Sequence, residues 1–155
     1  DRTALHQLID EIPETEVEHL AALVEAARKH DRLAVQTLLA EEVPAENDEL
    51  AALAEIDRSE PTISIEELER RPGMTELANP IYERADRDLG RLSESDRRVI
   101  FAAVRALGAG AIADVKKLKG RTEYRLRIGR WRALYELRDD QLIVLRILDR
   151  KDAYR

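Results

Sequence analysis

The chain has 155 residues, of which 44% are hydrophobic and 37% are charged, and its formal net charge is −6. The length allows one or two small domains, and the apolar content is sufficient for a core, which excludes a disordered chain. There is no cysteine for a disulfide or a thiolate metal site, and no apolar run approaches the roughly 20 residues that a membrane span needs. We therefore expect a cytoplasmic protein without a signal peptide or membrane contact.

The charge is divided unevenly along the chain. Residues 1–73 contain 19 acidic and 7 basic residues, a net charge of −12, whereas residues 74–155 contain 13 and 19, a net charge of +6. The breaker pair Pro72-Gly73 stands at this boundary, and Met74 after it is the only methionine. We interpret the pattern as two units of opposite charge that face each other, the second read from its own start residue.

The acidic half has the apolar spacing of helices. Its first two predicted helices are separated at Pro13 and together indicate a helical hairpin. Residues 40–48 indicate a polar, acidic loop, in which Asn47 or Asp48 would cap the next helix. A capping box at 64–67 opens a short amphipathic helix that is too thin to form a core alone. The predicted helices cover residues 3–12, 14–30, 31–39, 48–58 and 64–71.

The basic half begins with helices. Pro80 limits the run 76–82 to an edge strand or an irregular strand. Two helices are predicted over 83–92 and 93–107, and they should pack on the apolar side of a following sheet. Residues 114–123 indicate a basic loop that leads into that sheet.

Three strands are predicted after the basic loop. Tyr124–Ile128 alternates between apolar and basic residues, as a half-buried strand does. Gly129 opens a two-residue type II′ turn, and Trp131–Leu137 is the returning strand. Leu142–Leu148 is almost wholly apolar and should be covered on both faces. The result is a three-stranded antiparallel meander.

The sequence contains no common enzyme motif. The histidines are not at ligand spacing, so we expect no metal site, and no glycine-rich phosphate loop or serine nucleophile motif is present. What remains is cationic: Arg125, Arg127 and Arg132 project from the meander. Fixed guanidinium groups bind phosphate and stabilise developing negative charge, although the same pattern is also that of a solvated surface. The other cations expected to contact RNA are Lys116, Lys117, Lys119, Arg121 and Lys151.

The ordered run KKLKG, YRLRIG, WRALYEL, a two-acid turn, an apolar strand and the tail DRKDAYR resembles the RelE/ParE toxin superfamily. The resemblance covers residues 74–155. It implies an α+β protein in which a RelE-like fold, two helices packed on a small antiparallel sheet, follows a helical N-terminal part. RelE-like toxins cleave mRNA in the ribosomal A site by attack of a 2′-hydroxyl on the adjacent phosphate, without metal or cofactor. By motif position, the catalytic residues would be Arg125, Arg127, Arg132, Arg150 and Tyr154.

Two interpretations other than this endoribonuclease stay open. ParE-like members of the superfamily poison DNA gyrase and are not nucleases. Alternatively, this part of the chain is a catalytically inactive RNA- or protein-binding module. The chain also departs from the RelE pattern, because Leu148-Asp149 stands where members often have Gly-His, and this places an acid beside the cationic site.

The acidic half, residues 1–73, resembles the small antitoxins encoded upstream of such toxins, in ALHQLIDEIPETEVEHL and TISIEELERR. It has no ribbon-helix-helix or helix-turn-helix pattern, so DNA binding is not predicted. We expect its acidic segment to cover the arginines, either within the chain or swapped in a homodimer, so that the whole chain is a silenced toxin–antitoxin fusion whose toxin half would act on the ribosome and mRNA. The residues predicted to make the inhibitory contact are Ile63, Ile65, Glu66, Glu67, Leu68 and Glu69.

Overall fold

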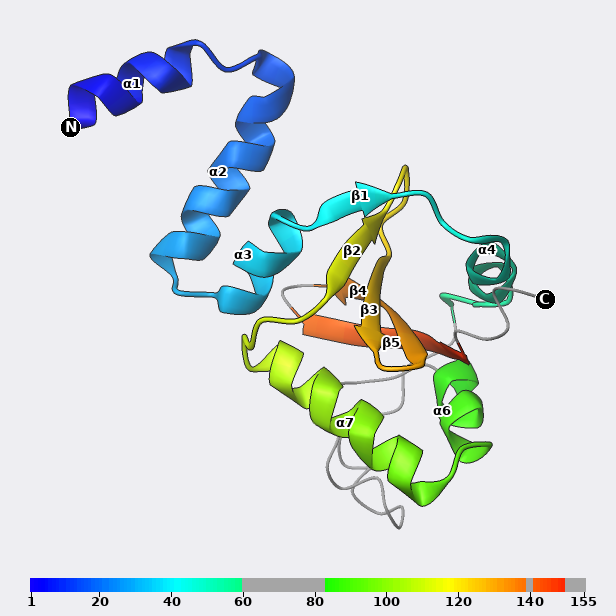
Figure 1. Cartoon of the computed structure of the whole chain (residues 1–155). Helices are drawn as coiled ribbons and strands as arrows, with labels where there is room; N and C mark the ends of the chain where they lie inside the picture. The colour runs from blue at the N-terminus through cyan, green and yellow to red at the C-terminus, as the bar shows by residue number, and fades with distance from the viewer. Residues whose placement is uncertain (60–82, 139–140, 150–155) are drawn as a thin grey trace.

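The computed structural model describes residues 1–59, 83–138 and 141–149 (Figure 1). Within these ranges no helix is both long and apolar enough to cross a membrane. The helices are α1 (Arg2–Asp10), α2 (Glu14–Arg28), α3 (Arg32–Leu38), α4 (Asn47–Ala54), α6 (Glu83–Gly90) and α7 (Glu94–Gly108). The strands are β1 (Glu41–Val43), β2 (Val115–Leu118), β3 (Tyr124–Ile128), β4 (Trp131–Arg138) and β5 (Gln141–Asp149).

The five strands form one sheet in the order β1-β2-β3-β4-β5. β1 pairs with β2 in parallel, and every other neighbouring pair is antiparallel. The predicted meander is therefore confirmed as β3–β5. Gly129 has a φ of 58°, whereas Arg130 is not in the left-handed region, so the turn between β3 and β4 is of the expected type II′.

Two strands lie where the sequence indicated loops. β1 falls within residues 40–48, and β2 falls within residues 114–123. Their sequences are charged rather than alternating, and the parallel register sets Glu41 beside Lys116 and Glu42 beside Lys117. Opposite charges on neighbouring strands stabilise this pairing, which a search for apolar periodicity does not detect. The expected strand over 76–82 and the expected helix over 64–71 lie outside the described residues.

One face of the sheet is covered by α6 and α7 (Figure 1). The alternation of β3 and β4 turns Leu126 and Ala133 toward this face, where they meet Phe101 from α7 and Leu89 from α6. All four are almost fully buried. The expected packing of two helices on the meander is confirmed, and this apolar layer is the main core of the C-terminal part.

The opposite face carries a smaller apolar cluster under α4. Leu53 of α4 packs with Leu134 of β4 and Leu145 of β5, and each of the three is at most 2% exposed. β5 is therefore buried on both faces, as its continuous apolar sequence predicted. α4 of the N-terminal half thus covers part of this side of the sheet in the same chain.

The first two helices do not close into the expected hairpin. α1 has no buried residue, and Ala26 is the only buried residue of α2. Figure 1 shows α1 turning away from α2, and both helices projecting from the body of the molecule as an arm. The arm is joined to the sheet through α3, whose Leu33 lies in the main core.

Candidate functional site

Strand parity brings the predicted arginines to one face of the sheet. Arg125 on β3 is paired with Leu134 on β4, and Arg127 is paired with Arg132. Arg125 and Arg132 are therefore diagonal neighbours across the two strands, within reach of the same partners. This is the face that α4 covers, and both guanidinium groups meet the amino-terminal end of that helix.

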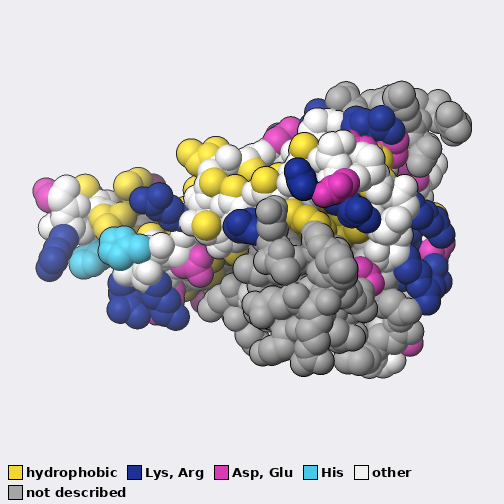
Figure 2. All heavy atoms as spheres, turned by 90° about the horizontal axis from the view of Figure 1, so that it is seen from below, with side chains coloured by type: hydrophobic (Ala, Val, Ile, Leu, Met, Phe, Trp, Pro, Cys, Tyr) yellow, Lys and Arg dark blue, Asp and Glu magenta, His cyan; other side chains and the backbone are white. Residues whose placement is uncertain are grey.

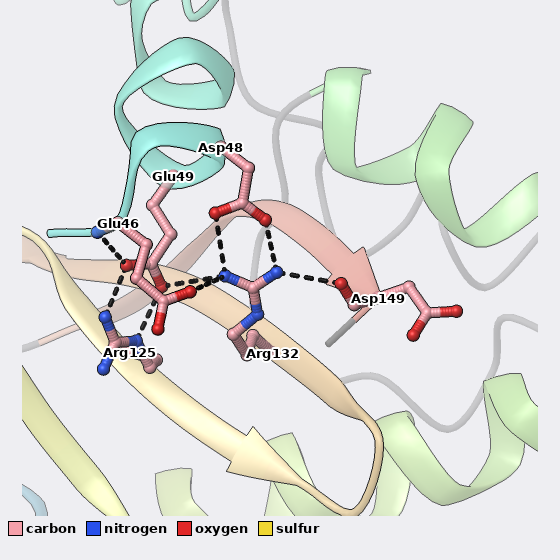
Figure 3. Close-up of polar contacts among 6 residues, drawn as sticks. All are labelled: Glu46, Asp48, Glu49, Arg125, Arg132 and Asp149. Atoms are coloured by element: carbon pink, nitrogen blue, oxygen red, sulfur yellow. Dashed lines mark hydrogen bonds and ion pairs between the residues drawn. The ribbon is translucent and has the colours of Figure 1, made fainter. Parts of the chain in front are cut away.

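Three carboxylates at the start of α4 enclose the two guanidinium groups (Figure 3). Arg125 donates from Nε to Oε2 of Glu49 at 2.6 Å and from Nη2 to the other oxygen of the same carboxylate. Arg132 donates from Nη1 to Glu46 and Asp48, each at 3.1 Å, and from Nη2 to the second oxygen of Asp48. Both arginines thus make two-pronged pairs with a carboxylate, a strong form of charge-assisted hydrogen bond.

Glu49 is the centre of this arrangement, which we call the carboxylate plug (Glu46, Asp48 and Glu49). Glu49 is 0% exposed, and its Oε2 also lies 3.4 Å from Nη1 of Arg132. The backbone N–H of Glu46 donates to Oε1 of Glu49 at 2.8 Å, so the carboxylate is fixed from both sides. Its place at a helix amino terminus adds the favourable field of the helix dipole.

Burial and pairing act on these groups in opposite directions. Burial alone would raise the pKa of Asp48, but the hydrogen bonds and positive charge of Arg132 outweigh burial and hold that pKa below its ordinary value. The bonds to Glu49 raise the pKa of Arg125, and the bonds to Asp48 raise the pKa of Arg132 against its burial. All of these shifts favour the ionised pair.

In a second polar contact the charges are exchanged: the N-terminal half supplies the arginine and the C-terminal part supplies the acids. Arg58, which follows α4, donates to Glu123 at 2.6 Å and to Glu136 at 3.2 Å. Glu123 directly precedes β3 and Glu136 lies on β4, and their side chains are 3% and 7% exposed. The pKa of Glu123 is lowered, because hydrogen bonds from Arg121 and Arg58 outweigh its burial. The N-terminal half thus supplies acids to buried arginines of the sheet and an arginine to its buried acids.

A third contact holds the far end of α4. Arg146 of β5 donates to Asp88 of α6 at 2.8 Å, and its Nη1 reaches the backbone carbonyl of Ala52 and the carboxylate of Glu55, each at 3.1 Å. The carbonyl of Ala52 lies in the last turn of α4, where a cation is favourable. Both ends of α4 are therefore held by arginines of the sheet.

The comparison with known protein families identifies the C-terminal part. The model of the ParE toxin of type II toxin-antitoxin systems, parDE, matches residues 75–154. The chain belongs to this family. A solved structure, the RelB-RelE antitoxin-toxin complex from Methanococcus jannaschii, contains a chain 26% identical to this one; the match covers 48% of this chain and 93% of that chain, with a TM-score of 0.41. No curated protein matches the sequence.

The ParE-family part brings together only some of the residues that the sequence selected. Arg125 and Arg132 lie together under the plug, whereas the acids that the sequence selected to cover them belong to residues 63–69, outside the described residues. Arg127 shares their face and is exposed. The carboxylate of Asp149 pairs with Arg130, and its backbone carbonyl accepts from Nη2 of Arg132 at 2.8 Å.

The expected RNA-binding cations are mostly paired with acids. Lys116 pairs with Glu41 at 2.9 Å and Lys117 with Glu42 at 3.2 Å, both across the β1–β2 edge. Arg121 pairs with Glu123 in the loop between β2 and β3, and Lys119 is exposed. The remaining predicted residues lie outside the described residues: Lys151, Arg150, Tyr154, and the inhibitory set Ile63, Ile65, Glu66, Glu67, Leu68 and Glu69.

Sequence reasoning did not select the plug. It placed the helix cap at Asn47 or Asp48, whereas the N-cap is Glu46 and the residue three positions on, Glu49, bonds back to it. That spacing is the signature of a capping box with a glutamate in the place usually taken by serine or threonine. A signal for the plug was available in the sequence. Three acids stand within four positions at the start of a helix, and the predicted sheet is rich in arginine.

The cluster is an anion-binding site in its chemistry. Two guanidinium groups, fixed by sheet geometry, present parallel N–H groups that match carboxylate or phosphate oxygens. In the described parts of the chain, no three His, Asp or Glu side chains are arranged to hold a metal ion. The oxygens that contact these two guanidinium groups are those of the plug carboxylates and the backbone carbonyl of Asp149.

Proposed function

We propose that the ParE-family part of this chain is a toxin that the N-terminal half of the same chain holds inactive. The observation that carries the proposal is the full burial of Glu49 against Arg125 and Arg132. A toxin that recognises its target through these guanidinium groups has no open anion site while the plug is in place. The neutralising segment is then residues 41–58, together with the segment at 63–69 that the sequence selected.

Covalent connection makes this neutralisation strong. The plug is tethered to its site, so a competing phosphate or carboxylate works against an effective concentration of order mM or more. Arg58 and Arg146 fasten the other end of the segment to the sheet, through Glu123, Glu136 and Glu55. Opening the site therefore requires the release of several ion pairs at once, and the intact chain is expected to be harmless to the cell.

The family match favours DNA gyrase as the target of the released toxin. The described part of the site supplies cations for binding an anionic surface. Apart from the plug itself, it supplies no group placed for proton transfer to a reacting hydroxyl. A gyrase poison needs binding and no proton transfer, whereas the predicted proton-transfer group of a nuclease, Tyr154, lies outside the described residues.

Cleavage of ribosome-bound mRNA is the second candidate, and it is favoured by the resemblance of the tail to RelE-like toxins. In that mechanism Arg125, Arg127 and Arg132 would hold the RNA backbone. Tyr154 would act as the proton-transfer group, and Arg150 would stabilise the charge on the phosphate. The decisive variant for this candidate is Tyr154→Phe, which removes proton transfer and keeps the aromatic ring.

The test uses the full chain with the plug neutralised, Glu46→Gln, Asp48→Asn and Glu49→Gln. We expect growth arrest on induction, because the neutral amides cannot form the two-pronged ion pairs that the carboxylates make with the guanidinium groups. The matched control, Glu18→Gln with Glu25→Gln and Glu94→Gln, removes three exposed acids elsewhere and should grow normally. Double-strand breaks in plasmid DNA would identify gyrase as the target, and primer extension on a translated message would identify mRNA cleavage.

Further variants separate the contribution of the N-terminal half to neutralisation from that of the ParE-family part to toxicity. Expression of residues 74–155 alone should arrest growth; if it is harmless, the toxin proposal is wrong. If residues 74–155 are toxic while the plug variant is harmless, neutralisation depends on the 63–69 segment instead. The charge swap Arg125→Glu with Arg132→Glu, placed in residues 74–155, should abolish toxicity while circular dichroism reports a folded sheet. A plain binding module would be harmless in every variant.

A further inference from the structure

The arm formed by α1 and α2 carries apolar side chains that the rest of the described chain does not cover. On α1, Leu5, Leu8 and Ile9 form one stripe and are 55%, 60% and 39% exposed. Val24 on α2 is 58% exposed. In Figure 2 hydrophobic side chains lie open along this arm, beside histidine, lysine and arginine side chains. An amphipathic helix with no buried residue has its apolar stripe free for a partner.

An apolar groove of about 680 Å³ lies at the other end of α2. It is formed by the end of α2, by α3 and by the loop after α7. Leu39 and Ile112 on its rim are 64% and 96% exposed, which is unusual for large aliphatic side chains. The residues that line it are Ala27, His30, Arg32, Val35, Gln36, Leu39, Gly110 and Ile112.

The wall of this groove is rigidly built. The side chain of Gln36 donates to the carbonyl of Ala111 at 2.9 Å and accepts from the N–H of Ala113 at 2.7 Å, so it clamps the loop on both sides of Ile112. Gly110 has a φ of 92°, and a Cβ there would lie 2.6 Å from Cβ of Arg32. The loop is thus fixed against α3 with the aliphatic side chain of Ile112 directed outward.

The arm cannot fill its own groove. α1 is about 14 Å long and α2 about 22 Å long, at about 1.5 Å per residue. If α1 folded back along its own α2, it would end well short of Ala27 and His30, where the groove begins. A second copy of the chain, with its α2 antiparallel to the first, would bring its α1 to that end of α2.

The charges favour this antiparallel arrangement. Residues 10–18 contain five acids and no lysine or arginine, whereas residues 28–32 contain three basic residues and one acid. Antiparallel α2 helices place the acidic start of one beside the basic end of the other, twice in the same pair. We propose that two copies of this chain form a two-fold dimer in which α1 of each copy packs its leucine stripe into the α2–α3 groove of the other.

The dimer is tested with the full-length chain by sedimentation velocity at micromolar concentration. The wild-type chain should sediment as a dimer. Leu8→Asp on α1 and Ile112→Asp at the groove should each weaken dimerisation by about 30-fold or more, as loss of an apolar anchor does. Val99→Asp, at an exposed position of α7 away from both surfaces, is the matched control and should leave the dimer intact.

A mixing experiment tests the swapped geometry directly. A Leu8→Asp homodimer and an Ile112→Asp homodimer each have no intact α1–groove contact. A mixed pair has one, between the unchanged α1 of the Ile112→Asp chain and the unchanged groove of the Leu8→Asp chain. Mixing should therefore restore dimer, detected by energy transfer between labelled chains.

The outcomes are decisive. A monomeric wild-type chain would overturn the proposal, and so would a dimer that is insensitive to both substitutions. A dimer that each substitution weakens but that mixing does not restore would place α1 and the groove in separate contacts, against the swapped arrangement. None of these readouts depends on toxicity, so the dimer and the proposed function can fail independently.

Discussion

The two faces of the sheet are covered in different ways. On the face under α6 and α7, apolar side chains from the same ParE-family part meet one another, as Phe101 and Leu126 do. On the face under α4, a small apolar cluster around Leu53 is bordered by ion pairs that join residues 65 to 91 positions apart in the chain. The first cover comes mainly from the ParE-family part, with Leu33 of α3 joining its core, whereas the second comes from the acidic half.

This difference separates stability from regulation. Apolar burial is non-directional and strong, and it makes the first cover permanent. Buried ion pairs add little net stability, because desolvation offsets much of their attraction, but they require a matching set of charges in fixed positions. A cover of this kind is specific, and it is less costly to release than an apolar one.

The largest effect is expected on the apolar face. Phe101→Ala removes a side chain that is 1% exposed in the main core, and the free energy of unfolding should fall by about 3–5 kcal/mol. Urea denaturation followed by the fluorescence of Trp131 measures it. Val99→Ala, at an exposed position two residues away on the same helix, should change the free energy of unfolding by less than about 0.5 kcal/mol. Similar losses for both variants would mean that α7 is not the permanent cover.

A smaller effect is expected at the plug. Glu49→Ala removes the carboxylate that pairs with Arg125, and the loss of these charge-assisted bonds should cost about 1.5–3 kcal/mol. Hydrogen exchange of the α4 amides should rise, while the amides of α7 keep their protection. The double variant with Arg125→Ala should lose less than the sum of the single variants, because both remove the same bonds.

The control for the plug is an exposed pair of the same chemistry. Arg98 donates to Glu94 at 2.7 Å, with both side chains 70% exposed. Glu94→Ala should therefore cost no more than about 0.5 kcal/mol. If Glu49→Ala is equally mild, or if it destabilises α7 as much as α4, the two faces do not differ in the way described above.

The sequence was informative where one face of an element is apolar. The alternation in Tyr124–Ile128 and the continuous apolar run Leu142–Leu148 predicted β3 and β5 almost to the residue. The apolar stripe before Gly108 likewise predicted α7. In β3 and α7 a single buried face selects both the secondary structure and its orientation. In β5 the continuous apolar run indicates a strand that is buried on both faces. The type II′ turn at Gly129 follows from glycine alone.

The sequence was not informative where the partner lies far along the chain. Glu41 and Lys116 lie on neighbouring strands and form an ion pair, although they are 75 residues apart in the sequence. Neither strand has an apolar periodicity of its own. The same holds for Glu49, whose role depends on Arg125 76 residues away. The sequence predicted that acids of the first half would cover the arginines, but it selected Glu66, Glu67 and Glu69, which lie outside the described residues, and it did not select the plug.

Acidification should weaken the charged cover before the apolar one. The pKa of Asp48 and the pKa of Glu123 are both lowered from ordinary values of 3.8 and 4.5, by Arg132 and by Arg121 and Arg58, against burial. The unfolded chain therefore binds more protons in this range, so the stabilisation is complete above about pH 5 and is lost as the pH falls below 4.

Hydrogen exchange of the α4 amides, measured from pH 6 to pH 3 and corrected for intrinsic rates, should show this release, while α7 stays protected to lower pH. Asp48→Asn with Glu123→Gln should flatten the dependence for α4. If α4 and α7 of the wild-type chain instead lose protection together at every pH, the two covers open as one unit. The ion pairs would then not form a separate cover that can be released.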